Sequence, residues 1–169
     1  MAISRRRVVR EKVLQTLYAH ELSKDPIAEV ITNVMGDLRN TREDFEFANK
    51  LVHEVIKHKT EIEQIIRTSV AHWEYDRIAV IDNILLRIGI CEFLYFPDIP
   101  PKVTINEAIE IAKLFSTEQS GKFVNGVLDA ILAGLKKSGL LHKIGRGLIE
   151  NNLTPKPPAA NKKRSREQS

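Results

Sequence analysis

Apolar residues recur at three- and four-residue intervals along most of this chain, which is the spacing of one face of an α-helix. The clearest runs cover residues 45–56, 62–70 and 123–135. Residue pairs that favour the first turn of a helix precede several of these runs: Asp25-Pro26, Thr41 with Asp44, Thr60 with Glu63, Thr104 with Glu107, and Ser116 with Gln119. No alternating strand pattern competes with this spacing. The pattern therefore predicts an all-α fold.

The segment from residue 77 to 96 is apolar on nearly all sides and leaves only a narrow polar strip at Asn83 and Arg87. A helix of this kind is typical of the centre of a bundle, where other helices surround it. Gly89 costs such a helix about 1 kcal/mol of propensity, so we expect it to let another helix approach closely. Three prolines predict an extended connection after this helix: Pro97, Pro100 and Pro101.

A cluster of basic residues precedes the first apolar stripe: Arg5, Arg6, Arg7, Arg10 and Lys12. In a helix, Arg6 and Arg10 continue into the line of Leu14 and Leu17. We therefore expect the apolar half to pack on the core and the first two turns to project past it into solvent. Guanidinium groups on a projecting helix end suit phosphate, because arginine stays charged and presents a planar fork of donors. The alternative is a basic N-terminus that only solubilises the chain.

Composition limits the classes of protein that fit. With 169 residues, 43% of them hydrophobic, the chain can bury a core of its own. No apolar stretch is long enough to span a bilayer, and the N-terminus lacks the apolar region of a secretory leader. The single cysteine, Cys91, fits a reducing compartment. We expect a cytoplasmic protein.

The net charge of +4 is unevenly distributed: residues 1–12 carry +4, residues 142–169 carry +5, and residues 13–141 carry −5. Basic ends suit a polyanionic ligand, and the acidic body suits a basic protein partner. Apolar periodicity stops after Gly139, and the remaining residues include closely spaced prolines and a run of Lys and Arg. We therefore expect a helical domain over residues 1–139 and a disordered basic tail over residues 140–169 that buries no core.

No cluster of residues in the sequence would carry catalysis. The five histidines, His20, His53, His58, His72 and His142, show no metal-ligand spacing with one another or with the cysteine. Cys91 lies in the apolar central segment, where a cysteine is typical of a core. The glycines form no phosphate-binding loop. The sequence predicts a protein that is not an enzyme and needs neither a metal nor a cofactor.

One motif near the end of the periodic region combines a basic, an aromatic and an amide side chain, namely Lys122, Phe123 and Asn125, with Gly126 directly after them. An Asn-Gly pair usually indicates a turn, yet this one lies within a strong helical pattern. We expect Gly126 to permit close helix packing. Lys122 and Phe123 suit a phosphate and an unstacked base of single-stranded RNA.

Further motifs lie in a fixed order along the chain: Arg6-Arg7, Arg10-Glu11, Leu14-Gln15 and Leu17-Tyr18, then Arg87-Ile88, Glu92-Phe93-Leu94 and Ile99-Pro100, then residues 105–113 and 122–129. Together they resemble the NusB family of bacterial transcription antitermination factors. The similarity covers residues 5–138 and is most specific in its second half. No motif matches between residues 23 and 73, and the basic tail is an addition to the usual domain.

The resemblance implies a compact bundle of about seven helices in two helical subdomains. It also implies binding of the boxA element in nascent ribosomal RNA leaders, together with the ribosomal protein that acts as NusE, so that RNA polymerase reads through terminators. The RNA-binding residues are then Arg5, Arg6, Arg7, Arg10, Tyr18, Lys113, Lys122, Phe123 and Asn125. The partner-binding residues are Glu107 and Asp82, which matches a position that the family uses for this partner.

Two other classes of function stay open. A purely protein-binding helical adaptor would use Asp82, Glu107 and Glu110 for a basic partner, while the arginines only solubilise the chain. The NusB-like domain also occurs fused to rRNA cytosine methyltransferases as an RNA-binding module. The chain leaves no room for a methyltransferase, which favours a stand-alone factor.

Overall fold

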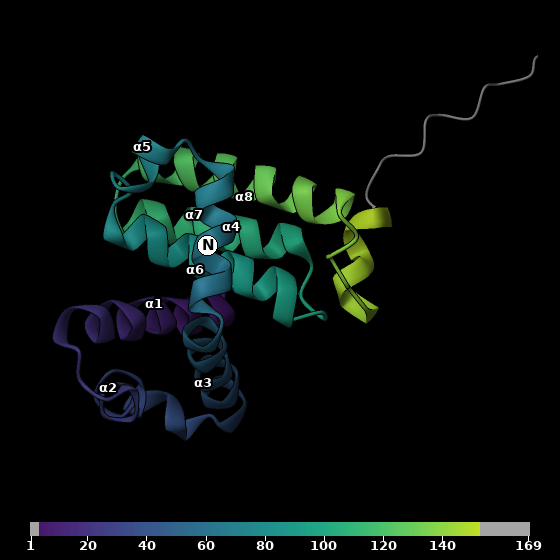
Figure 1. The fold of residues 1–169 in the computed structure, drawn as a ribbon. Helices are drawn as coiled ribbons and strands as arrows, with labels where there is room; N and C mark the ends of the chain where they lie inside the picture. Colours follow the sequence, from purple (N-terminus) through teal and green to yellow (C-terminus); the bar gives the residue numbers. More distant parts are fainter. Residues whose placement is uncertain (1–3, 153–169) are drawn as a thin grey trace, which may run out of the picture.

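The computed structural model describes residues 4–152 (Figure 1). Eight α-helices and two 3₁₀ helices lie within these residues: α1 (Arg5–Ser23), α2 (Ile27–Met35), η1 (Gly36–Asn40), α3 (Arg42–Lys57), α4 (Lys59–Ser69), α5 (His72–Tyr75), α6 (Val80–Tyr95), α7 (Pro101–Phe115), α8 (Glu118–Lys137) and η2 (Gly145–Asn152). No strand occurs in this part of the chain, so the predicted all-α fold is confirmed. The helix beyond the expected seven is α5, which is a single turn.

The helices form two layers that meet at α6 (Figure 1). In the first layer, drawn in purple and blue, α1, α2 and α3 pack together. In the second layer α6, α7 and α8 pack on one another. Because α1 and α3 both contact α6, one hydrophobic core runs through both layers. These layers are the two helical subdomains that the sequence suggests.

α6 has the buried central position that its apolar pattern predicts, since Leu86, Ile90 and Phe93 are inaccessible to solvent. Gly89 faces α8, where a Cβ atom at this position would lie 2.9 Å from a methyl carbon of Leu128. The predicted close approach at Gly89 is therefore confirmed. Gly126 has no packing neighbour within 4 Å of the place that a Cβ would take, so the close packing expected there is wrong.

The helix starts of the second layer differ from the predicted caps. α7 begins at Pro101, because the fixed φ angle of proline suits the first helical position. The Thr104 hydroxyl lies inside this helix and donates to the Glu92 carboxylate at 2.9 Å. α8 is capped by Thr117, whose side chain accepts a hydrogen bond from the backbone N–H of Ser120 at 3.0 Å. Thr104, which the local pattern assigned to capping, thus forms a tertiary contact instead.

The described structure continues past Gly139, where the sequence predicts the boundary between domain and tail. Lys143 Nζ donates to the backbone oxygens of Glu92 at 3.0 Å and Phe96 at 2.9 Å. These two carbonyls lie at the C-terminal end of α6, and each also accepts a backbone N–H, from Phe96 at 3.2 Å and from Ile99 at 3.1 Å. A cation at this helix end is electrostatically favourable.

Backbone contacts with Pro97 position the turn after Lys143. The Ile144 N–H donates to the Pro97 oxygen at 3.0 Å. Gly147 lies so close to the same oxygen that a Cβ atom would be 2.0 Å away from it. Residues 140–152 therefore belong to the folded domain. The remainder of the predicted tail, residues 153–169 with most of its basic groups, lies outside the described residues.

We expect Gly147→Ala to lower the free energy of unfolding by about 1–3 kcal/mol, because the new methyl group overlaps a backbone oxygen. The matched variant Gly126→Ala, which has open space within α8, should gain up to about 1 kcal/mol of helix propensity. Urea unfolding of both variants measures the two changes. Unchanged stability of Gly147→Ala would contradict a structural role for residues 140–152.

Candidate nucleic-acid interface

The basic start of α1 lies against carboxylates in the first turn of α3. Arg5 Nε donates to Asp44 Oδ2 at 2.5 Å, and Arg6 Nη2 donates to Glu43 Oε1 at 2.8 Å. The Arg6 guanidinium carbon also lies 4.3 Å from the centre of the Phe47 ring, a cation–π arrangement. Both arginines remain partly exposed, so each can still contact a ligand at the surface.

Arg7 and Glu107 bind each other across α1 and α7. Arg7 Nε and Nη2 donate to the two Glu107 carboxylate oxygens at 2.8 and 3.1 Å. These hydrogen bonds raise the pKa of Arg7 above its ordinary value. The sequence assigned Arg7 to RNA and Glu107 to a protein partner. In the structure the two residues bind each other and join α1 to α7.

Arg10 is buried, which contradicts the expectation that the first two turns of α1 project into solvent. It is 4% exposed, and its Nε and Nη2 donate to Glu92 of α6 at 2.9 and 2.7 Å. Burial alone would lower the pKa of Arg10, but the charge and hydrogen bonds of Glu92 outweigh burial and leave this pKa raised. In this arrangement the donor fork of Arg10 is directed at Glu92 and not at the surface.

Four other residues of the predicted RNA-binding set lie on α1, α7 and α8. Tyr18 is 38% exposed on α1. Lys113 is exposed near the end of α7, with Nζ 3.3 Å from the Glu110 carboxylate. On α8, Lys122 is exposed and Asn125 is half-buried. None of these four lines the pocket that Phe123 enters.

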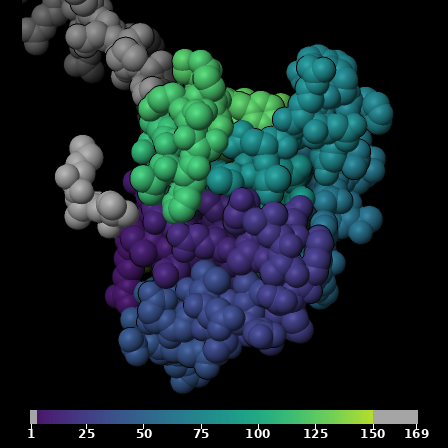
Figure 2. Space-filling view, turned by 90° about the vertical axis from the view of Figure 1, so that its left-hand side faces the viewer, coloured from purple at the N-terminus to yellow at the C-terminus, as the bar shows by residue number. Residues whose placement is uncertain are grey.

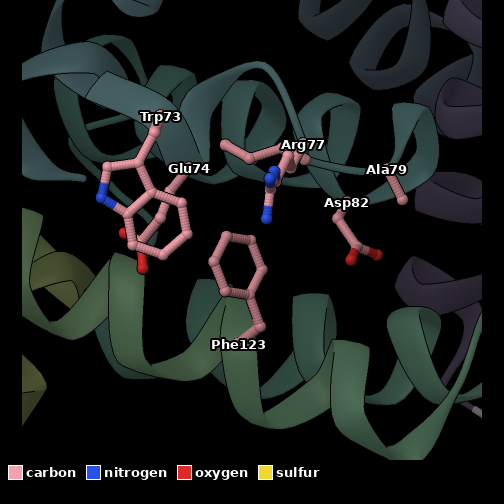
Figure 3. Close-up of a pocket in the computed structure, with 7 residues that line it drawn as sticks. Trp73, Glu74, Arg77, Ala79, Asp82 and Phe123 are labelled. Atoms are coloured by element: carbon pink, nitrogen blue, oxygen red, sulfur yellow. The ribbon is translucent and has the colours of Figure 1, made fainter. Parts of the chain in front are cut away.

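Phe123 and Asp82 line one pocket between α8 and the segment that joins α5 to α6, with a volume of about 260 Å³. The Phe123 ring points from α8 toward Arg77, and the Trp73 indole stands beside it (Figure 3). Figure 2 shows a cleft between the green end of the molecule, where α7 meets α8, and the teal α4–α5 region. The predicted RNA residue Phe123 and the predicted partner residue Asp82 are therefore neighbours.

Asp82 is 6% exposed at the edge of this pocket. Its Oδ2 accepts a hydrogen bond from the Ser120 hydroxyl at 3.0 Å, while Oδ1 is buried with no hydrogen-bond partner in the described part of the chain. Burial raises the pKa of Asp82 above its ordinary value, and the Ser120 hydrogen bond only partly opposes this effect. A buried carboxylate oxygen without a hydrogen bond costs free energy, so a donor that reached it would be favoured.

Sequence reasoning missed Trp73 and Arg77. Trp73 is 62% exposed, and the Arg77 guanidinium lies 5.6 Å from the centre of its ring system. The available signal was a tryptophan at the edge of an apolar run with an arginine four residues later, which places both on one side of the chain entering α6. Large exposed aromatic groups beside a cation are typical of binding surfaces.

Within the described residues, no group of three or more His, Cys, Asp or Glu side chains is placed to hold a metal ion. Burial raises the pKa of the Cys91 thiol in α6 above its ordinary value, which keeps the thiol protonated. None of the helices in residues 4–152 is both long enough and apolar enough to cross a bilayer. The surface does offer binding chemistry, with exposed cations beside aromatic rings and a carboxylate acceptor in a pocket.

Cations beside aromatic rings on a helical surface are chemistry that nucleic-acid-binding proteins use. Residues 7–133 match the model of the NusB family. The transcription antitermination protein NusB of Chloroherpeton thalassium is 46% identical over 155 residues, which cover 89% of this chain and 71% of that protein. The corresponding protein of Salinibacter ruber is 45% identical over 148 residues, covering 87% of this chain and 92% of that protein. The chain belongs to the NusB family.

Solved structures agree with this assignment. A structure of T. maritima NusB superimposes with a TM-score of 0.70 at 34% identity, covering 77% of this chain and 92% of that one. A crystal structure of the antitermination factors NusB and NusE in complex with dsRNA contains a chain that superimposes with a TM-score of 0.69 at 28% identity. That match covers 76% of this chain and 96% of the other.

We expect Arg10→Ala to lower the free energy of unfolding by about 3–5 kcal/mol, because it leaves the buried Glu92 carboxylate without its cation. Arg42→Ala is the control, since the Arg42–Glu46 pair is exposed and should contribute almost nothing. Urea unfolding measures both changes. Equal effects of the two variants would show that the Arg10–Glu92 pair does not hold α1 to α6.

Asp82→Asn should raise the free energy of unfolding at neutral pH. The raised pKa of Asp82 means that the folded chain holds this proton more tightly than the unfolded chain does. The ionised carboxylate therefore costs stability above the folded-state pKa, and this cost disappears as the pH falls through that pKa. Thermal unfolding across a pH series should show a stabilisation by Asp82→Asn that vanishes in acid, with the exposed Asp129→Asn as control. A lower stability of Asp82→Asn at neutral pH would contradict this interpretation.

Proposed function

We propose that this chain is a transcription antitermination factor that binds boxA-type RNA of nascent ribosomal RNA leaders together with the ribosomal protein that acts as NusE. The observation that carries the proposal is the match to a solved assembly that holds NusB, NusE and dsRNA together, in a chain that belongs to the same family. In this role the chain helps RNA polymerase read through terminators. It acts by binding and not by catalysis, in the cytoplasm where transcription takes place.

The proposed RNA contacts are the surface cations Arg5 and Arg6 on α1, Lys113 on α7 and Lys122 on α8. Contacts to phosphate supply affinity that depends on salt and carries no information about the bases. Base preference requires unstacked bases, which pack on aromatic rings and hydrogen-bond with amide groups. Tyr18, Phe123 and Asn125 supply such groups in our proposal.

The proposed partner contact is the pocket of Trp73, Asp82 and Phe123. The net charge of −5 over residues 13–141 attracts a basic protein at long range. At short range, Asp82 Oδ1 lacks a donor, and the two aromatic rings suit the aliphatic stem of a lysine or an arginine. This chemistry recognises a basic side chain, as a ribosomal protein would present.

A second candidate function is a helical adaptor that binds protein alone. The observation that favours it is the pairing of every arginine at the start of α1 with a carboxylate of the same chain, which leaves less free charge for RNA than the sequence suggests. Fluorescence anisotropy with a short boxA-type RNA separates the two functions. We expect salt-dependent RNA binding that tightens when the basic partner is added, and the adaptor would bind the partner without RNA.

The RNA should be tested as a single strand and as a duplex, because the solved assembly holds dsRNA whereas our proposal concerns a single strand. A transcription assay with a terminator placed after a boxA-type leader tests the activity itself. We expect the chain to raise read-through in the presence of the partner. Absence of both RNA binding and read-through would overturn the proposed function.

Asp82→Lys should weaken binding of the basic partner by about 1–3 kcal/mol, because it places a like charge where the donor of the partner binds. RNA binding by the isolated chain should change no more than it does in the charge-matched control. Asp129→Lys, on the exposed side of α8, is the control for the change in net charge. The milder Asp82→Asn should weaken partner binding in the same direction, which guards against misfolding of the lysine variant. Equal partner affinity of all these proteins would remove Asp82 from the interface.

A further inference from the structure

A second hollow, which we call the N-terminal groove, lies between the start of α1, α3, the connection from α6 to α7, and the C-terminal segment. Its volume is about 550 Å³, within the range of about 300–1,000 Å³ that pockets for small ligands span. The lining residues that matter here are Arg6, Phe47, Lys50, Phe96, Asp98 and Arg146. The N-terminal groove shares no lining residue with the pocket of Asp82 and Phe123.

Some of the charged residues that line the groove have an ion-pair partner, and others have none. Arg10 and Glu107 also line it, but each is held by a partner elsewhere in the chain. Lys50 and Arg146 are exposed and form no ion pair within residues 4–152. Lys50 Nζ lies 4.6 Å from the centre of the Phe96 ring. The groove therefore presents two unpaired cations on walls from α3 and η2, beside one exposed carboxylate, Asp98, and the excess of positive charge suits an anionic ligand.

Three side chains that contact one another line the groove: Arg6, Phe47 and Phe96. The Phe47 and Phe96 rings meet edge to face, with centres 5.8 Å apart and planes at 77°. The Arg6 guanidinium covers the Phe47 ring at 4.3 Å, and its Nη2 is fixed by Glu43. The partly exposed guanidinium, held against the ring, is a surface on which an unstacked nucleobase can pack.

Arg146 reaches the groove because the C-terminal segment is anchored to the end of α6. Figure 1 shows this segment in yellow beside the ends of the helices of the second layer. Lys143 binds the Phe96 oxygen, and the Ile144 N–H binds the Pro97 oxygen, at 2.9 and 3.0 Å. The groove thus has a wall that a domain ending at residue 139 would lack.

We propose that the N-terminal groove binds one unstacked nucleotide of single-stranded RNA. The Arg6–Phe47 stack carries the base, and Lys50 and Arg146 hold the phosphates on either side of it. The exposed Asp98 carboxylate, which forms no ion pair within residues 4–152, is an acceptor for a base amino group or a ribose hydroxyl. This inference rests on the proposed RNA-binding function and adds a nucleotide site in which Arg6 of α1 acts together with residues of α3 and of the C-terminal segment. A paired base cannot enter, so the site distinguishes a single strand from a duplex.

The test is the salt dependence of RNA affinity for the double variant K50A/R146A in the full chain. Fluorescence anisotropy with a short fluorescein-labelled boxA-type RNA gives the slope of log affinity against log salt. Loss of two contacts to a single strand should lower that slope by about 1.4, at about 0.7 for each contact. The matched control K57A/K137A removes the same charge from exposed positions on α3 and α8 that do not line the groove. Its slope should equal that of the unchanged protein.

The same RNA annealed to its complement provides the second arm. We expect K50A/R146A and K57A/K137A to bind the duplex equally well. Equal slopes of the two double variants on the single strand would overturn the proposal. An equal loss on the duplex would reduce the groove to a general phosphate site and would overturn the nucleotide site as well. Loss of protein-partner binding with RNA binding intact would show that the groove takes an acidic protein segment instead.

Failure of the groove site can be distinguished from failure of the proposed RNA-binding function. If the unchanged protein itself binds RNA without salt dependence, or does not bind it, the RNA-binding function fails before any variant is compared. If the unchanged protein binds RNA and only Lys122→Ala weakens the complex, the proposed function stands and the N-terminal groove is excluded. Circular dichroism of both double variants checks that the helical fold is intact.

Discussion

The buried ion pair between Arg10 and Glu92 is the interaction on which the arrangement of the two layers depends. It joins α1 to α6 in the interior, where a charge is tolerated only when a partner and hydrogen bonds surround it. Thr104 of α7 donates to the same carboxylate, and Lys143 donates to the backbone oxygen of Glu92. Four segments that are distant in sequence therefore meet at one residue. The basic start of α1 thus has a structural role, whether or not it also binds a ligand.

This role of α1 redistributes the charge that is available to a ligand. Arg5 and Arg6 contact α3 and Arg7 contacts α7, so the arginine cluster is largely neutralised by the protein itself. The cations that have no such partner lie elsewhere, including Lys50 and Arg146 at the N-terminal groove. Affinity for RNA then depends on several sites spread over the surface, and the pocket of Asp82 stays free for a basic protein.

The sequence predicted those parts of the fold that local burial determines. The central position of α6 was predictable because a helix surrounded by others needs apolar residues on every side. The close approach of a second helix at Gly89 was predictable because only glycine leaves room for it. The burial of Arg10 could not be predicted, because its partner lies 82 positions away and the local pattern shows only a basic helix start. Residues 140–152 carry no periodic signal, since their place depends on backbone contacts with Phe96 and Pro97. The pocket of Asp82 and Phe123 could not be predicted either, because it forms only when α8 packs against the chain that enters α6.

The division between structural and RNA-binding arginines is tested most directly by the Nε–Hε signals of the arginine side chains in nuclear magnetic resonance spectra. Addition of single-stranded boxA-type RNA should shift the signals of Arg6 and Arg146, which face solvent at the groove. The Arg10 signal should stay in place and exchange slowly with solvent, because its donors are buried on Glu92. A shift of the Arg10 signal as large as that of Arg6 would show that α1 releases its buried arginine to the RNA, which would contradict the structural role of the Arg10–Glu92 pair.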